Sequence, residues 1–272
     1  MEPLKFKKMH GSGNDFILID NRTSLIQADT AHDLARRLCR RRFSIGADGL
    51  ILIEGSETAD FRWRFFNADG SEAEMCGNGG RCAARFAVLT GIAGPKLKFE
   101  TGAGLIHAEV KGAKVKLELP APADMELNIS IDVKDDRVTT HFINTGVPHA
   151  VVLVDDLKRC DVVGLGRAIR FHERFKPAGA NVDFIKLEGR DVLIRTYERG
   201  VEGETLACGT GSVAGAIIAA VKIGLAPPLR VKTRSGEVLK VYFDLNGGEA
   251  RDVFLEGEAV LVYSGTLDGD IC

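Results

Sequence analysis

Two cysteines stand at the starts of similar segments, where their surroundings favour acid–base chemistry. Cys76-Gly77-Asn78-Gly79 precedes a helix-length stretch that closes at Gly91, and Cys208-Gly209-Thr210-Gly211 precedes another that closes at Gly224. Both stretches favour a helix, and a glycine fits the C-terminal end of each. The helix dipole lowers the pKa of a thiol at a helix N-terminus. Uncovered N–H groups there also favour a bound carboxylate or phosphate.

Two thiols on opposite sides of one carbon atom provide the chemistry of stereochemical inversion. One thiolate removes the proton from Cα, and the other thiol delivers a proton to the opposite face. The N–H groups of Gly77-Asn78 and Gly209-Thr210 would bind the adjacent carboxylate and stabilise the charge that spreads into it. We expect no metal and no cofactor: no metal cluster is evident and no lysine is marked for pyridoxal phosphate, although the sequence alone does not exclude that cofactor.

The remaining cysteines carry the simpler interpretation of small buried apolar residues. They are Cys39, Cys82, Cys160 and Cys272. All six are too sparse for a disulfide framework and form no paired CxxC zinc motif, which indicates a thiol-reduced, cytoplasmic protein. A second class of function stays open at this point: a redox-switch or ligand-binding protein in which Cys76 and Cys208 form a disulfide.

The elements that must position the two thiols come in two similar sets. Thr101-Gly102 lies 25 residues after Cys76, and Thr233 lies 25 after Cys208. Asn14-Asp15-Phe16-Ile17 also has an apparent counterpart in residues 181–185. Apolar patterning predicts helices over 31–41 and 165–171, and strands over 4–6, 16–20, 50–54, 61–66, 96–101, 105–110, 114–119 and 150–154. It also predicts a turn and then a strand within 179–187, a strand and then a turn within 192–200, and alternating strands within 229–263.

We therefore predict an α+β fold of two pseudo-symmetric domains, each a mostly antiparallel sheet wrapped around a central helix. The helix after Cys208 is apolar nearly all round, as expected inside a shell of strands. Pro120-Ala121-Pro122-Ala123 is the best domain linker. The expected domains are residues 1–120 with 258–272, carrying Cys76, and residues 121–257, carrying Cys208. The active site is expected in the cleft between them.

The composition excludes several classes of protein. Apolar residues make up 45% and charged residues 27% of the chain, with a net charge of −2. This balance gives no electrostatic case for a nucleic acid or an anionic membrane as a partner. No apolar run reaches the roughly 18–20 residues that span a bilayer, and residues 1–8 lack the apolar segment of a signal peptide.

The two cysteine motifs resemble those of the diaminopimelate epimerase family, and three further motifs match in order. These are residues 9–16 (Met-His-Gly-Ser-Gly-Asn-Asp-Phe), 66–71 (Phe-Asn-Ala-Asp-Gly-Ser) and 197–200 (Tyr-Glu-Arg-Gly). The resemblance covers nearly the whole chain. It implies a cofactor-independent epimerase that interconverts LL- and meso-diaminopimelate in lysine and peptidoglycan-precursor synthesis, with Cys76 and Cys208 as acid–base thiols. A homodimer is also implied.

The resemblance also implies roles for other residues. Glu198 suits the reacting ammonium and Arg199 the distal carboxylate, while His149 and Glu198 match positions thought to tune the cysteines. The implied substrate contacts are Asn14, Asn67, Asn181, Glu198, Arg199 and the backbone of Gly77, Asn78, Gly209 and Thr210.

Two positions depart from a common form of the family. Gly49 stands where some members have glutamine, and Val147 stands where many have asparagine. A related alternative is an isomerase of the same fold that acts on proline, hydroxyproline or another acid. Arg199 with Asn67 and Asn181 favours diaminopimelate, because a substrate with one amino-acid end does not need them.

Overall fold

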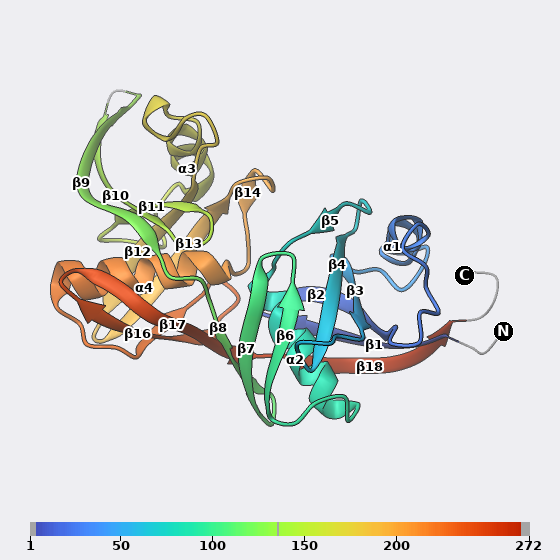
Figure 1. The fold of residues 1–272 in the computed structure, drawn as a ribbon. Coiled ribbons are helices and arrows are strands. Elements are labelled where there is room, and N and C mark those ends of the chain that lie inside the picture. Colours follow the sequence, from blue (N-terminus) through green and yellow to red (C-terminus); the bar gives the residue numbers. More distant parts are fainter. Residues whose placement is uncertain (1–3, 135, 268–272) are drawn as a thin grey trace. The chain divides into compact units, whose positions relative to one another are not determined.

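The computed structural model describes residues 4–134 and 136–267 of the 272-residue chain (Figure 1). The chain divides into two compact units: unit 1 is Met1–Leu117 with Gly257–Cys272, and unit 2 is Glu118–Glu256. The described residues of each unit form mainly strands with two α-helices, which confirms the α+β class. Within the described ranges, no helix has the length and apolar character that crossing a membrane requires.

Unit 1 begins with a tight hairpin. The strands β1 (Leu4–Gly11) and β2 (Asn14–Asp20) are antiparallel, and Ser12 and Gly13 between them have φ of 58° and 84°. Two successive positive φ angles match the two-residue turn that suits twisted hairpins. The other elements are α1 (Ala31–Leu38), β3 (Gly49–Glu54), β4 (Phe61–Asn67), β5 (Glu72–Ala73), α2 (Gly77–Leu89), β6 (Lys96–Thr101), β7 (Gly104–Lys111), β8 (Lys114–Glu118) and β18 (Val260–Leu267).

Unit 2 opens with a long hairpin that the sequence analysis did not predict. It joins β9 (Ala123–Val133) to β10 (Asp136–Asn144), and β9 is exposed at most positions, so it lacks a clear apolar alternation. The other elements are β11 (Pro148–Leu153), α3 (Val162–Arg170), the 3-10 helix η1 (Glu173–Phe175), β12 (Asn181–Glu188), β13 (Asp191–Glu198), β14 (Gly203–Glu204), α4 (Gly209–Ile223), β15 (Leu229–Lys232), β16 (Val238–Asn246) and β17 (Glu249–Glu258).

Both units follow one order of elements. In unit 1, α1 connects the parallel strands β2 and β3, and in unit 2, α3 connects the parallel strands β11 and β12. An antiparallel strand (β4 or β13), a two-residue strand (β5 or β14) and a cysteine-led helix (α2 or α4) then follow in each unit. The internal repeat predicted from the sequence is therefore present in the fold.

The strand register corrects one part of the predicted repeat. Phe16 pairs with Gly49 across the parallel strands of unit 1, and His149 pairs with Asn181 across those of unit 2. Asn181 therefore occupies the position of Gly49. Asn14 and Asn181 each begin a strand, but these two strands hold different positions in the repeat. The expected match between the two residues is therefore wrong.

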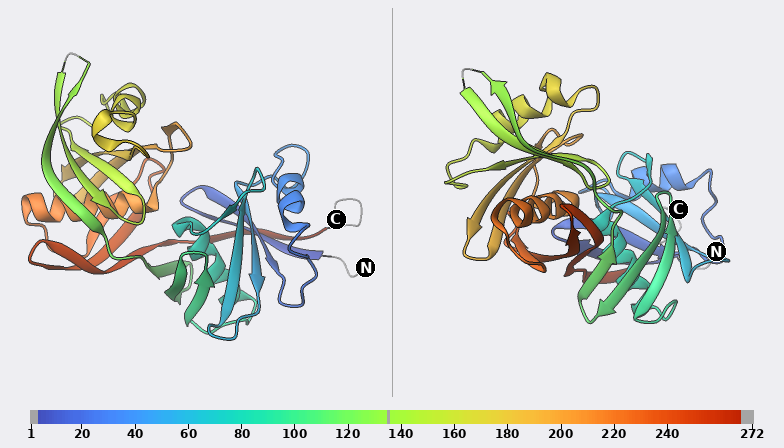
Figure 2. Two further views of the ribbon diagram at one scale, coloured as in Figure 1. Left: turned by 45° about the horizontal axis from the view of Figure 1, so that its top comes forward. Right: turned by 60° about the vertical axis from the view of Figure 1, so that its left-hand side comes forward.

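The two helices of each unit pack on opposite faces of the same strands. In unit 1, α2 contacts β1, β2, β3 and β7, and α1 contacts β3 and β4 (Figures 1 and 2). Alternate side chains of a strand point to opposite faces, so Leu50 and Leu52 pack with α1 while Ile51 lies beside α2. In unit 2, α4 contacts β10, β11, β12, β13, β15 and β16, and it is buried throughout residues 211–220. This burial confirms the predicted central helix.

Two helix boundaries differ from the prediction. The helix α1 ends at Leu38 rather than residue 41, because the returning chain donates N–H groups from Gly46 to Leu38 O at 2.9 Å and from Ala47 to Cys39 O at 3.2 Å. The helix α3 starts at Val162 rather than residue 165. The side chain of Asp161 caps it by accepting the Gly164 N–H at 2.9 Å.

Candidate active site

Cys76 is the N-cap residue of α2. Its backbone is extended, with φ −147° and ψ 116°, and its Sγ accepts the N–H of Gly79 at 3.5 Å. The N–H groups of Gly77 and Asn78 donate no hydrogen bond within the described ranges. A Cβ added at Gly77 would meet nothing within 4 Å. The helix start therefore combines a thiol, two unused donors and open space, which suits a bound anion.

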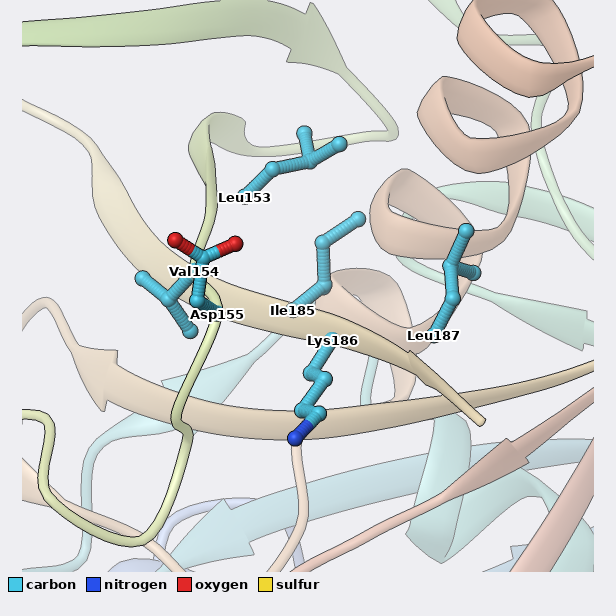
Figure 3. A pocket seen from close by; sticks show the side chains of 6 residues that line it. All are labelled: Leu153, Val154, Asp155, Ile185, Lys186 and Leu187. Carbon is cyan, nitrogen blue, oxygen red and sulfur yellow. The ribbon is translucent and has the colours of Figure 1, made fainter. Parts of the chain in front are cut away.

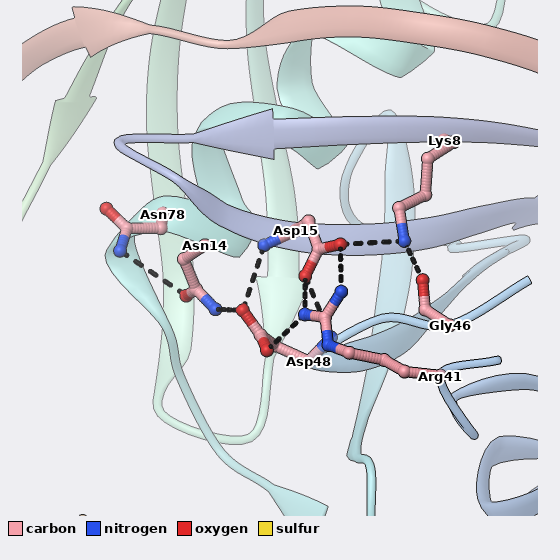
Figure 4. Close-up of polar contacts among 7 residues, drawn as sticks. All are labelled: Lys8, Asn14, Asp15, Arg41, Gly46, Asp48 and Asn78. Carbon is pink, nitrogen blue, oxygen red and sulfur yellow. Dashed lines mark hydrogen bonds and ion pairs between the residues drawn. The ribbon is translucent and has the colours of Figure 1, made fainter. Parts of the chain in front are cut away.

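Asn14 links the β1–β2 hairpin to this thiol. The Cys76 thiol donates to Asn14 Oδ1 at 3.7 Å, and Asn78 Nδ2 donates to the same oxygen at 3.4 Å. Asn14 Nδ2 in turn donates to Asp48 Oδ2 at 2.7 Å (Figure 4). Because that bond fixes the amide orientation, the carbonyl oxygen of Asn14 faces the thiol. The structure thus brings together three residues expected at the site: Asn14, Cys76 and Asn78.

A network of charged side chains holds Asp48 and the β1–β2 hairpin in place (Figure 4). Arg41 bridges the two carboxylates, with Nη2 at 2.5 Å from Asp15 Oδ1 and 2.8 Å from Asp48 Oδ1. Lys8 adds an ion pair to Asp15 at 2.8 Å and also donates to Gly46 O. Burial raises the pKa of Asp15, but hydrogen bonds from Arg41 and Lys8 outweigh it and lower that pKa to about 2.

Sequence analysis missed this network because it placed Arg41 inside the helix predicted over 31–41. The helix stops before Arg41, and its guanidinium turns back to the hairpin. Arg81 was also missed. It is fully buried on α2, and its Nη2 donates to Ser12 Oγ and Asn78 Oδ1, each at 2.9 Å. An arginine within an apolar helix was the available signal, because a buried charge is costly unless it is paired.

Cys208 is the N-cap residue of α4 and repeats the geometry of Cys76. Its φ and ψ are −116° and 118°, and its Sγ accepts the N–H of Gly211 at 3.4 Å. The N–H groups of Gly209 and Thr210 donate no hydrogen bond within the described part of the chain. The Thr210 hydroxyl lies 3.4 Å from Cys208 Sγ. Cys208 is 8% exposed and therefore lies deeper than Cys76, which is half-buried.

His149 stands behind Thr210 with a fully buried carboxylate on its other side. Its Nε2 lies 3.0 Å from Thr210 Oγ1, and its Nδ1 lies 2.6 Å from Asp183 Oδ2. Asp183 also accepts the Thr196 hydroxyl at 2.7 Å. Asp183 was not predicted as a site residue, although a charged residue inside the apolar β12 was the signal. The strand alternation that points Ile185 at α4 points Asp183 there too.

Asn181 contacts the same histidine, the carboxyl of Glu198 interacts with it electrostatically, and the backbone of Arg199 contacts Asn181. Asn181 Oδ1 accepts the backbone N–H of Arg199 at 2.8 Å, and its Nδ2 lies 3.5 Å from His149 Nε2. The Arg199 guanidinium makes no ion pair or side-chain hydrogen bond with residues 4–134 or 136–267. This arginine is therefore available for an acidic ligand.

The environment of Cys208 changes the expected thiol chemistry. Burial raises the pKa of Cys208 well above its usual range, the carboxylates of Glu198 and Asp183 raise it further, and hydrogen bonds with Thr210 and the Gly211 N–H lower it. The lowering expected from the helix N-terminus is therefore wrong for the net pKa of Cys208. Burial also raises the pKa of the Glu198 carboxyl.

Three expected or doubtful positions are not joined to the thiols by direct contacts. Asn67 Nδ2 donates to Ser71 Oγ at 3.0 Å in the turn between β4 and β5. A Cβ at Gly49 would lie 2.5 Å from Phe65 Cε2 and 2.7 Å from Phe66 O, so close packing requires glycine there. Val147 is half-buried, and its carbonyl accepts the N–H of Thr145.

A cavity of about 290 Å³ lies elsewhere in unit 2 (Figure 3). It is at the far end of β11 and β12, where Leu153 pairs with Ile185, whereas His149 and Asn181 pair at the near end. The lining residues are Leu153, Val154, Asp155, Ile185, Lys186 and Leu187. Four residues of strand place this cavity on the order of 13 Å from the histidine, so it is separate from the cysteine site.

The comparison with protein families decides the membership of this chain. The family model described as diaminopimelate epimerase matches residues 6–121 and 141–262. The chain belongs to the diaminopimelate epimerase family. A family member from Aquifex aeolicus is 48% identical over 98% of this chain and 99% of its own length. Members from Chlorobaculum tepidum and Archaeoglobus fulgidus are 46% and 43% identical over 95% and 97% of the chain, and over 99% and 96% of their own lengths.

Solved structures support the fold of this family member. A phenazine biosynthesis protein of the PhzF family from Bacillus anthracis is similar with a TM-score of 0.76 at 17% identity, over 98% of this chain and all of that one. A probable proline racemase from Agrobacterium radiobacter has a TM-score of 0.72 at 16% identity, over 98% and 93%. At such identities the likeness shows the fold alone. As a member of an epimerase family, the chain is an isomerase.

Proposed function

We propose that this protein interconverts LL- and meso-diaminopimelate by a cofactor-independent reaction in which Cys76 and Cys208 are the two acid–base groups. Family membership over nearly the whole chain carries the choice of substrate. The repeated geometry of the two N-cap cysteines supports the mechanism, because inversion needs one proton donor and one proton acceptor.

The reaction moves two protons and changes no oxidation state. One cysteine thiolate takes the proton from Cα, and the electron pair of the C–H bond spreads into the adjacent carboxylate. The other thiol then gives its proton to the opposite face of the carbon. The first cysteine ends as a thiol and the second as a thiolate, so the two must exchange protonation states before the next turnover in the same direction.

The unused N–H groups at the two helix starts would bind the reacting carboxylate. They belong to Gly77, Asn78, Gly209 and Thr210. Such fixed donors stabilise developing negative charge without reorganising. We assign the reacting ammonium to Glu198, a further substrate contact to Asn14, and the distal amino-acid end to Asn67, Asn181 and Arg199. The guanidinium of Arg199, which has no carboxylate partner in the described chain, suits that distal carboxylate.

The test follows hydrogen exchange at the α-carbon in deuterated water. Wild type should incorporate deuterium into diaminopimelate while interconverting the two isomers. Cys76→Ala and Cys208→Ala should each abolish interconversion with the fold intact by circular dichroism. Turnover of proline but not of diaminopimelate would overturn the substrate, and full activity in either cysteine variant would overturn the mechanism.

We also propose a cytoplasmic homodimer that has diaminopimelate as its small-molecule partner and needs neither nucleic acid nor membrane. Symmetric dimers are the commonest oligomers of soluble proteins. Cys39, Cys160 and Cys208 are free thiols, which suits a reducing compartment. Light scattering after gel filtration tests the dimer, because a mass near 29.4 kDa would indicate a monomer.

A further inference from the structure

One layer of side chains differs between the two units although the surrounding fold is the same. The strand pairings place Phe16, Ile51 and Phe65 of unit 1 at the positions that His149, Asp183 and Thr196 occupy in unit 2. The layer is apolar in unit 1 and polar in unit 2. Both versions are almost fully buried, with no member more than 5% exposed.

Each layer lies beside the third residue of its cysteine-led helix. A Cβ at Gly79 would lie 3.2 Å from Ile51 Cδ1, and one at Gly211 would lie 2.3 Å from Asp183 Oδ1. Unit 1 shows that the repeat folds with an apolar layer here. Burying polar groups costs free energy unless they are fully hydrogen-bonded. The polar layer of unit 2 therefore calls for an explanation other than folding.

The hydrogen bonds fix the tautomer of His149. Asn181 Oδ1 accepts the Arg199 N–H, so its Nδ2, which can only donate, faces Pro148 O and His149 Nε2. Nε2 is therefore an acceptor, and the ring proton sits on Nδ1, where it is donated to Asp183.

The same logic sets the direction of the chain as far as the thiol. Because His149 Nε2 accepts, the Thr210 hydroxyl donates to it at 3.0 Å. The Thr210 oxygen is then free to accept the S–H of Cys208 at 3.4 Å. Every proton in the chain points from Cys208 toward the imidazole.

We infer that Thr210, His149 and Asp183 form a proton relay that takes the thiol proton of Cys208 and returns it. The inference deepens the proposed function, on which it rests, by naming how one of the two acid–base groups is activated. Cys208 and Thr210 lie at the reacting end, whereas Asp183 is a positioning residue that acts through His149.

The step balances without any further reactant. The S–H bond of Cys208 breaks and an O–H bond forms on Thr210, whose own proton moves to Nε2 of His149. The products are a thiolate and an imidazolium, and the imidazolium keeps its Nδ1–H bond to the Asp183 carboxylate. The carboxylate stabilises the imidazolium, as a buried acidic partner does in a hydrolytic triad. Reversal restores the thiol.

The groups that face this relay explain why the thiol needs it. On β13 the Glu198 carboxylate and on β12 the Asp183 carboxylate both oppose a negative charge on Cys208. The N–H groups at the start of α4 favour that charge. An imidazolium formed on β11 by the same proton transfer offsets the two carboxylates, so thiolate and imidazolium form together.

The experiment measures alkylation of Cys208 in the full chain without substrate, by iodoacetamide and peptide mass spectrometry across pH. Thr210→Val removes the hydroxyl with little change in shape and should slow alkylation about tenfold or more near neutral pH, because only the thiolate reacts. Thr210→Ser should restore the wild-type profile. Asp183→Asn should shift the profile to higher pH, because losing the partner of the imidazolium outweighs losing the repulsion between the Asp183 carboxylate and the thiolate.

Two controls separate the relay from a structural effect. Ser212→Ala removes another hydroxyl at the start of α4, one that donates to the Cys208 carbonyl rather than to its thiol, and should leave the profile unchanged. The alkylation rate of Cys76 in each variant is the second control. Equal Cys208 profiles in wild type and Thr210→Val, or no rescue by serine, would overturn the relay.

The readout does not depend on epimerase activity, so the two proposals fail separately. If Cys208 alkylation responds as expected but diaminopimelate is not turned over, the relay stands and the proposed function falls. If diaminopimelate is turned over but alkylation ignores Thr210, the function stands and the relay falls.

Discussion

The two cysteine sites share a scaffold and differ in what lies behind it. Each thiol is an N-cap that accepts the N–H three residues along, and each follows a two-residue strand. Behind Cys76 the layer is apolar, and the thiol donates to the side-chain amide of Asn14. Behind Cys208 the layer is polar and leads to the buried carboxylate of Asp183. The repeat thus fixes where a thiol sits, while one layer of side chains differentiates its acid–base behaviour.

A second shared feature braces both sites. Arg64 forms a two-pronged ion pair with Glu72, and Arg195 forms one with Glu204 at the same positions of the repeat. Each glutamate lies four residues before its cysteine. The two pairs differ in depth, since the side chain of Glu72 is 42% exposed and that of Glu204 is 7%.

The largest expected effect comes from removing either thiol. Cys76→Ala and Cys208→Ala should each lower kcat for epimerisation by roughly 10²–10⁴ or more, the range of a lost acid–base group. Coupled assays starting from LL- and from meso-diaminopimelate measure this loss. Alanine at one site should remove proton exchange on one face only, which isotope exchange followed by chiral separation would detect. Equal residual exchange on both faces would break the proposed division between the sites.

Glu198 occupies in unit 2 the position that Asn67 occupies in unit 1. A substitution of Glu198 therefore tests a difference between the two cysteine sites. Glu198→Gln should lower kcat about a hundredfold if the carboxylate takes part in proton transfer. Burial raises its pKa in the folded state, so its contribution to stability is greatest below the unfolded value of 4.5 and is lost as pH rises through the folded value.

The variant should therefore have a higher melting temperature than wild type at pH 8 and the same one at pH 4. Calorimetry at both pH values measures the difference. A stability gain that did not depend on pH would show that ionisation of Glu198 is not its source.

The free energy of unfolding that is lost when an Arg–Glu pair is broken should be larger for the more buried pair. Arg195 donates to the carbonyls of Leu157 and Cys160 and is held there without a partner charge in Glu204→Gln. This variant should lower the free energy of unfolding by about 3 kcal/mol. Glu72→Gln at the exposed pair should cost about 1 kcal/mol or less. Urea unfolding of the two variants under one set of conditions measures both costs. Equal costs would mean that the deeper pair is no more important than the exposed one.

The sequence predicted the scaffold better than the chemistry behind it. The repeat of Cys-Gly-x-Gly before an apolar helix was sufficient to predict both N-cap thiols and the central helices, because these features are local and periodic. The relay was not predicted beyond His149, since strand register, which is set by long-range pairing, places Asp183 beside α4. Register also decides that Asn181 corresponds to Gly49, where the letters alone suggested Asn14.

Near Cys76, Asp15 makes a contribution to stability that depends on pH. Its sign is opposite to that of the contribution of Glu198. Ion pairs lower the pKa of Asp15 from 3.8 to about 2, so its stabilising contribution is complete above the unfolded value and is lost as pH falls from about 4 to about 2. The shift corresponds to at most about 2 kcal/mol, reduced by solvent screening.

Asp15→Asn should therefore destabilise the protein at pH 7 by about 1 kcal/mol, with a difference from wild type that shrinks toward pH 3. Urea unfolding across that range measures the change. Asp20→Asn is a matched control. Asp20 lies on the same strand as Asp15, at the end away from Asn14, and pairs with the exposed Arg22. If Asp15 positions the Asn14 amide through Asp48, its variant should also slow epimerisation while the control does not. A loss of stability with unchanged kcat would confine the role of the network to folding.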